Sequence, residues 1–281
     1  MEKKEKIIIA LSIIFTLAAG TLHYAEAPPV LAFVITAGAL ALLAMIVGDA
    51  TEQLGSRLGP GATGILQSGL GNLPELFVCI FALRAGLDHV VQAALIGSIL
   101  GNSVFVLGLA LFLGGLKNGT QRFKSGPPKM IVALMFLATA ALAVPTLTKL
   151  VHTPAEPHIA SLDIFLAVIL LVLLAASIYF SIKGDPAVSV SKENMGHAEW
   201  SMKLTIIVLA LAGGGAAFVS DWFVEALQPA MKTLGISEAF AGLVVVAVAG
   251  WCSLFPTRHE GRQALWPFVR RRGARISPAS A

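Results

Sequence analysis

The sequence predicts an all-α, polytopic membrane protein with about eight transmembrane helices. Two features of the composition favour a membrane setting: 56% of the 281 residues are hydrophobic and only 13% are charged. Soluble proteins carry about 25% charged residues. The third observation is that apolar runs of membrane-spanning length recur along the whole chain. We therefore expect a multi-pass integral membrane protein whose surroundings are the lipid bilayer.

The apolar runs, and the Gly, Pro and charged residues that interrupt them, define the expected helices in chain order. Their approximate bounds are 7–25, 29–54, 61–85, 89–115, 129–149, 161–182, 203–228 and 237–255, of which the last is the weakest. The first run follows three lysines in the manner of a signal peptide, but no small-residue cleavage pattern clearly follows it. We interpret it as an uncleaved first span.

Basic residues indicate the orientation of the spans, because cytoplasmic loops are enriched in Lys and Arg. With the N-terminus inside, the outer loops before Gly250 hold only Arg84, Lys149 and Lys232. The inner loops hold Lys3, Lys4, Lys6, Arg57, Lys117, Arg122, Lys124, Lys129, Lys183, Lys192 and Lys203. This asymmetry supports the number of spans and a cytoplasmic N-terminus. The net charge of +4 follows from the topology, so we expect no nucleic-acid partner.

The run Gly71-Asn72-Leu73-Pro74-Glu75 places a carboxylate within an apolar segment. A carboxylate inside a bilayer is costly, so it predicts a functional site. Asn72 and Glu75 are three residues apart and share one face of a helix. Gly71 and Pro74 loosen the same turn and free backbone carbonyl groups. These oxygen-bearing groups predict a cation site.

A second polar cluster lies in the next span, where Ser98 and Asn102 are one helical turn apart. Gly97 and Gly101 form a small-xxx-small pair that lets another helix approach closely. We expect Ser98 and Asn102 to converge with Asn72 and Glu75 where the two spans cross. The alternative is that the serine and the asparagine only form hydrogen bonds between helices.

A partial internal repeat is visible. Ala50-Thr51-Glu52 precedes an apolar span that leads to Gly71, and Val219-Ser220-Asp221 precedes an apolar span that leads to Gly250. Five spans, two to six, separate the start of the first copy from the start of the second, and this odd number inverts the second copy in the membrane. Inverted repeats are typical of secondary transporters, which bind their substrate near the middle of the bilayer. We therefore expect an inverted-repeat transporter fold with the second repeat incomplete.

The run from Gly48 to Gly115 resembles the first alpha repeat of the calcium/proton exchangers, a branch of the calcium/cation antiporter superfamily. The features that carry the resemblance are Ala50-Thr51-Glu52, Gly59-Pro60, Gly71-Asn72, Pro74-Glu75, Phe81-Ala82-Leu83, Gly86-Leu87, Val90-Val91-Gln92, Gly97-Ser98, Gly101-Asn102 and Gly114-Gly115-Leu116. Residues 219–250 resemble the opening of the second alpha repeat. Sodium/calcium exchangers usually carry Thr or Ser in place of Asn72, which favours the proton-coupled branch.

The resemblance implies a domain organisation along the chain. It comprises an extra span at 1–28, a first repeat at 29–183 with its core at 48–116, a cytoplasmic linker at 184–202, the start of a second repeat at 203–250 and an aberrant basic tail at 251–281.

The resemblance also implies roles for individual residues. Glu75 is expected to bind Ca²⁺ directly, and Asn72, Ser98 and Asn102 to offer oxygens or to position water. Glu52 and Asp221 are expected near the inner ends of their spans, where they line the cytoplasmic entrance; the alternative is that both are ordinary carboxylates at helix ends. Calcium is the transported substrate, and no cofactor is expected.

The sequence departs from the family after Gly250, where the family continues with an asparagine and a second carboxylate. Here Trp251-Cys252-Ser253 follows, and the last 31 residues contain six arginines and no lysine. This switch predicts a frameshift near codon 250. The alternative is a genuine short variant, whose Arg270-Arg271-Arg272 rests on anionic lipid.

The function expected is calcium/proton antiport by a multi-pass protein of a prokaryotic plasma membrane. The alternatives are a non-transporting remnant or subunit, and a cation exchanger of the sodium/calcium type. An enzyme is not expected, because no nucleophile has a paired base in the sequence. The sequence leaves the oligomeric state open.

Overall fold

The structure is a computed structural model, and it describes residues 3–25, 27–58, 66, 69–119, 126–152, 154, 156–182 and 199–246. Across these residues the chain is helical and contains no strand. Six of the helices are long and apolar enough to cross a membrane. The elements in chain order are α1 (Lys3–Tyr24), α2 (Pro29–Leu58), α4 (Leu73–Arg84), α5 (Asp88–Leu100), η1 (Gly101–Val106), α6 (Leu107–Asn118), α7 (Gly126–Leu150), η2 (Glu156–His158), α8 (Ile159–Ile182), α9 (Met202–Leu234), α10 (Glu238–Phe240) and η4 (Ala241–Val246).

The helices follow the expected spans closely, with two informative differences. The fourth span is interrupted by the π-helix η1 between α5 and α6, which a hydropathy pattern does not reveal. Within the third span, helix α4 begins at Leu73, directly after a turn at residues 70–72. Pro74 explains this start. Proline is favoured in the first turn of a helix, because it has no backbone N–H to donate to a preceding turn. The tail from residue 247 onward lies outside the described residues.

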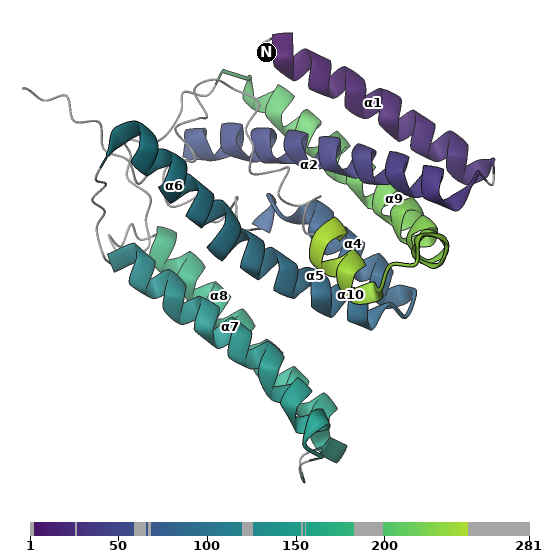
Figure 1. Cartoon of the computed structure of the whole chain (residues 1–281). Coiled ribbons are helices and arrows are strands. Elements are labelled where there is room, and N and C mark those ends of the chain that lie inside the picture. The colour runs from purple at the N-terminus through teal and green to yellow at the C-terminus, as the bar shows by residue number, and fades with distance from the viewer. Residues whose placement is uncertain are drawn as a thin grey trace, which may run out of the picture.

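The core of the molecule is the antiparallel pair of α2 and α9 (Figure 1). The Phe33 ring on α2 stacks on the Phe223 ring on α9, with a centroid distance of 5.5 Å. Near the other end of the pair, the Arg57 guanidinium donates a hydrogen bond to the Trp200 carbonyl, just before α9 begins. These contacts put the end of α2 beside the start of α9. Close packing of buried apolar side chains along this pair forms most of the core among the described residues.

The α2–α9 pair has an internal twofold pattern in its buried hydroxyl groups. Thr36 and Thr51 are 15 positions apart on α2, and Thr205 and Ser220 have the same spacing on α9. All four side chains are at most 1% exposed. Leu40-Ala41-Leu42 and Leu209-Ala210-Leu211 occupy matching positions within the two stretches.

The hydrogen bonds repeat with the same symmetry. The Thr36 and Thr205 hydroxyls each donate to the backbone carbonyl four residues earlier, at 2.7 and 3.1 Å. Among the described residues, the Thr51 and Ser220 hydroxyls each have no hydrogen-bond partner. Equivalent positions therefore share both their burial and their bonding, which is consistent with an inverted repeat.

The expectation that Glu52 and Asp221 both lie near inner ends is wrong. Glu52 directly follows Thr51, near the end of α2 that contacts Trp200. Asp221 lies two residues before Phe223, at the opposite end of the α2–α9 pair, where Phe223 meets Phe33. The physical reason is the inversion itself, because an odd number of spans between two copies puts equivalent residues at opposite ends.

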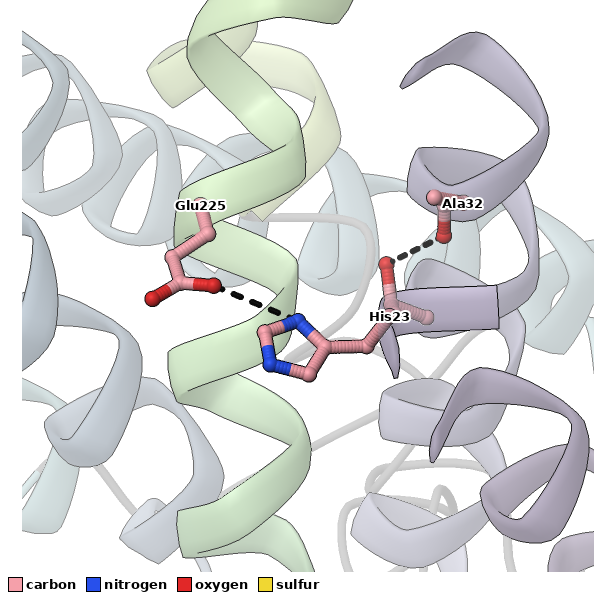
Figure 2. Close-up of polar contacts among 4 residues, drawn as sticks. His23, Ala32 and Glu225 are labelled. Atoms are coloured by element: carbon pink, nitrogen blue, oxygen red, sulfur yellow. Dashed lines mark hydrogen bonds and ion pairs between the residues drawn. The ribbon is translucent and has the colours of Figure 1, made fainter. Parts of the chain in front are cut away.

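Helix α1 packs along the outer side of α2 and is tied to α9 at both of its ends (Figure 1). At its start, the Glu5 carboxylate accepts a hydrogen bond of 3.1 Å from the indole N–H of Trp200, and each residue is 2% exposed. At its end, His23 Nδ1 lies 3.2 Å from a Glu225 carboxylate oxygen, as Figure 2 shows. The His23 ring also stacks on Trp222. The N-terminal extra span is therefore part of the bundle.

Helices α7 and α8 form a hairpin whose main contacts are with each other. Its large apolar side chains are mostly exposed, among them Phe136, Ile164, Phe165 and Leu171. Because water would penalise such a surface, this face suits the hydrocarbon of a bilayer.

Candidate cation site

The candidate site is built on the first turn of α4. The chain turns at residues 70–72, and Asn72 occupies the position immediately before the helix. Glu75 is the third residue of α4, and its side chain is half-buried. The broken helix thus places a carboxylate beside backbone groups that a continuous helix would have used internally.

The Ser98 hydroxyl on α5 donates a hydrogen bond to the Glu75 carboxylate on α4. The two residues are 23 positions apart in the chain, and the short connection after α4 folds α5 back against it. Leu87, in this connection, is 2% exposed, and the Val78 and Ala82 side chains on α4 are buried in the same core. The polar pair is therefore set among apolar residues, where its interaction is poorly screened.

The other predicted site residues are placed less centrally. The Asn72 side chain is exposed and makes no capping hydrogen bond. Gly71 is buried in the turn before it. Asn102 lies in η1, and its side chain is outside the described part of the structure. Within the described residues, Glu75 and Ser98 are the predicted site residues that a hydrogen bond joins.

Gly97, the first glycine of the predicted small-xxx-small pair, does receive another segment of the chain. Gly97 lies against the backbone of Leu243 in η4, and Gly242 of η4 lies against the backbone of Val90 and Ala94 on α5. The sequence did not identify this partner, which comes from the start of the second repeat. Ser98, the next residue after Gly97, therefore lies where both repeats meet.

Two further features of the site were not found from the sequence. Both η1 and η4 are π-helices of six residues. Such π-helical turns are rare and often occur at functional sites. Gly101 opens η1 and Gly242 lies in η4, so a glycine inside an apolar span was the only local signal.

The groups that this arrangement offers to a ligand are oxygen atoms. A carboxylate and a hydroxyl in direct contact, near a broken helix, are suited to hold a hard cation or a proton. Among the described residues no group of three or more His, Cys, Asp or Glu side chains could hold a metal ion. A site of the transition-metal type therefore has no support in this part of the chain.

Comparison with known proteins identifies the family. The family model described as "sodium/calcium exchanger protein" matches residues 28–183. The Ca²⁺/H⁺ antiporter ChaA of Bacillus subtilis is 31% identical over 250 residues, which cover 87% of this chain and 70% of the relative. Vacuolar cation/proton exchanger 3 of Oryza sativa is 30% identical and matches 82% of this chain and 58% of its own length.

A solved structure agrees with the sequence relatives. The structure of native YfkE superposes with a TM-score of 0.71 at 27% identity, covering 93% of this chain and 71% of that chain. The fold, the broken helix with its carboxylate and these similarities lead to one conclusion: the chain belongs to the sodium/calcium exchanger protein family.

Proposed function

We propose that this protein is a calcium/proton antiporter that moves Ca²⁺ across a membrane in exchange for H⁺ by alternating access. The observation that carries the proposal is the hydrogen bond between Ser98 and Glu75 inside an apolar bundle. The similarity to proteins named Ca²⁺/H⁺ antiporters supports the choice of ions. The chain spans 70% and 72% of the length of two of these relatives, so activity of the whole protein belongs to the proposal.

The chemistry of exchange follows from competition for one carboxyl group. An isolated negative charge is costly in a medium of low dielectric, so Glu75 carries either a proton or a cation. Ca²⁺ takes about six to eight oxygen ligands. Glu75 supplies the charge, and Ser98, Asn72, Asn102 and carbonyl groups freed near Gly71 supply or position neutral oxygens. Binding of Ca²⁺ displaces the proton, and protonation releases Ca²⁺.

The setting proposed is the plasma membrane of a prokaryote, with the N-terminus in the cytoplasm. The exposed lysines Lys4, Lys6 and Lys203 gather with Arg57 at one end of the α1–α2–α9 bundle, which supports this orientation. Glu52 lies at that end and is the candidate for the cytoplasmic entrance. The other end carries Glu225.

The test is ion movement in liposomes that contain the purified chain. Calcium-dependent proton movement is expected with the native chain and is expected to disappear with Glu75→Gln, which keeps the shape of the side chain but cannot be ionised. Glu156→Gln is the matched control, because this carboxylate is exposed and pairs with His152 in the α7–α8 connection. Retained exchange in Glu75→Gln contradicts the assignment of the site.

Two other functions predict different outcomes in the same liposomes. A sodium/calcium-type exchanger would move Ca²⁺ against a sodium gradient without proton movement. A non-transporting form would bind Ca²⁺ through Glu75 but produce no flux. This last outcome deserves a test because the chain spans 70% and 71% of the length of two of the proteins that it matches.

A further inference from the structure

Helix α5 and the π-helix η4 contact each other through two glycines, and we call this contact the Gly97–Gly242 crossing. Gly97 on α5 lies against Leu243, and Gly242 in η4 lies against Val90, Ala93 and Ala94. Both residues are buried. A Cβ atom added at Gly97 would overlap the carbonyl oxygen of Leu243 and lie 2.9 Å from its Cα. Only a residue without a side chain fits there.

The contact is reciprocal. A Cβ atom added at Gly242 would overlap the carbonyl oxygen of Val90, and it would lie 2.7 Å from the Ala93 Cβ and 2.9 Å from the Ala94 amide nitrogen. Most of these atoms belong to backbone, which cannot swing away as a side chain does. Each segment therefore needs its own glycine to reach the other. Such close crossings at small residues are a main source of helix association in membranes.

The position of the crossing gives it consequences beyond packing. Gly97 precedes Ser98, and Ser98 donates its hydrogen bond to Glu75. On the second repeat, Gly242 and Leu243 lie within the π-helix η4. A shift of η4 relative to α5 would therefore displace the residue that orients the site carboxylate.

We propose that the Gly97–Gly242 crossing is a positioning device that sets the affinity of the Glu75 site for Ca²⁺. It holds the start of the second repeat against α5 and fixes the direction from which Ser98 approaches Glu75. This inference rests on the proposed function, because it assumes that Glu75 binds calcium. Neither glycine contributes an atom to the bound ion in this proposal.

The test measures Ca²⁺ binding to the purified chain in detergent, together with helical content and thermal unfolding without calcium. Gly97→Ala and Gly242→Ala are each expected to raise the Kd by about tenfold or more, because a displacement of about 1 Å can cost a positioned site about a hundredfold. Gly108→Ala on α6 and Gly214→Ala on α9 are matched controls, since among the described residues no atom beyond the glycine's own stretch of helix lies within 4 Å of an added Cβ at either position. Both controls should keep the native Kd.

Three outcomes distinguish a failure of this inference from a failure of the proposed function. If the native chain and Glu75→Gln bind Ca²⁺ equally, the proposed function fails and the inference falls with it. If Glu75→Gln loses binding but folded Gly97→Ala and Gly242→Ala bind like the controls, the inference alone is overturned. Weaker binding by folded glycine variants, with unfolding temperatures close to native, supports it, because a purely structural role would change stability rather than the Kd.

A milder variant covers the case in which the alanine variants do not fold. Ala93→Ser adds one hydroxyl to a Cβ atom that already lies beside Gly242, and it adds no Cβ atom to either glycine. A measurable rise in its Kd supports the positioning role. A native Kd in Ala93→Ser, or loss of folding in all three variants, overturns that role and leaves the crossing as general packing.

Discussion

The hydroxyl of Ser98 on α5 reaches across to the carboxylate of Glu75 on α4 and donates a hydrogen bond to it. This relationship turns an isolated carboxylate in an apolar helix into part of an oriented polar pair. An orienting donor matters because a carboxylate can bind a cation in several directions, of which an enclosed site uses few. The pair is therefore the natural first target for substitution.

Replacement of Ser98 with alanine is expected to weaken Ca²⁺ binding by about tenfold, because a hydrogen bond to a charged group contributes about 1.5–3 kcal/mol. Binding isotherms of the purified chain measure this change. Ser56→Ala is the matched control, since that hydroxyl donates only to the Gln53 carbonyl of its own helix, at 2.9 Å. Equal affinities in Ser98→Ala and Ser56→Ala would remove Ser98 from the site.

Replacement of Phe223 with alanine is expected to destabilise the α2–α9 pair by about 3–5 kcal/mol. Phe223 is 0% exposed and stacks on Phe33, so its loss leaves a cavity at the core. Unfolding of the detergent-solubilised chain, followed by circular dichroism, measures the effect. Phe218→Ala on the same helix is the control, because Phe218 is 69% exposed and should change the free energy of unfolding far less. Similar losses in the two variants would contradict the packing described for α9.

Replacement of Trp200 with phenylalanine is expected to cost about 1–3 kcal/mol, because the buried Glu5 carboxylate loses its indole donor. The same unfolding measurement applies. Glu5→Gln should be milder, since the amide oxygen can still accept the bond from Trp200. A larger loss in Glu5→Gln than in Trp200→Phe would show that this hydrogen bond is not what ties α1 to α9.

The inversion of the repeats predicts which residues face the same side of the membrane. Cysteines that replace Lys6 and Lys203 should react with a membrane-impermeant thiol reagent from one side, and a cysteine that replaces Lys232 should react from the other. All three lysines are exposed, and Cys79 and Cys252 must first be replaced. Labelling in vesicles of both orientations distinguishes the sides. Reaction of all three positions from one side would refute the placement of α9 across the membrane, because Lys203 and Lys232 lie at its two ends.

Much of the fold could be predicted because it depends on local patterns. Apolar run length located the spans, and the glycine and proline around Glu75 predicted the break before α4. The interruption at η1 could not be predicted, because a π-helical turn does not change the hydropathy of the segment that contains it. The same holds for the partner of Gly97, which lies in η4, well over a hundred residues further along the chain.

The residues of the site also differ in how far the sequence predicts their positions. Helical spacing placed Asn72 and Glu75 on one face, but the helix starts after Asn72 and leaves that side chain exposed at its end. Ser98 was expected to meet Glu75, and in the structure the two are joined. The sequence around Asp221 does not give the direction in which its helix crosses the bundle, and that direction puts Asp221 at the end opposite to Glu52.

By itself, the sequence determined the membrane class, the approximate spans, the broken helix around Glu75 and the family. These properties follow from the burial preference and backbone freedom of residues close together in the chain. Only the tertiary structure decided that Ser98 donates a hydrogen bond to Glu75, that α5 and η4 meet at Gly97 and Gly242, and that Glu52 and Asp221 lie at opposite ends of one helix pair. The physical reason is that helical period fixes which residues share a face, whereas the packing of distant segments fixes which faces meet.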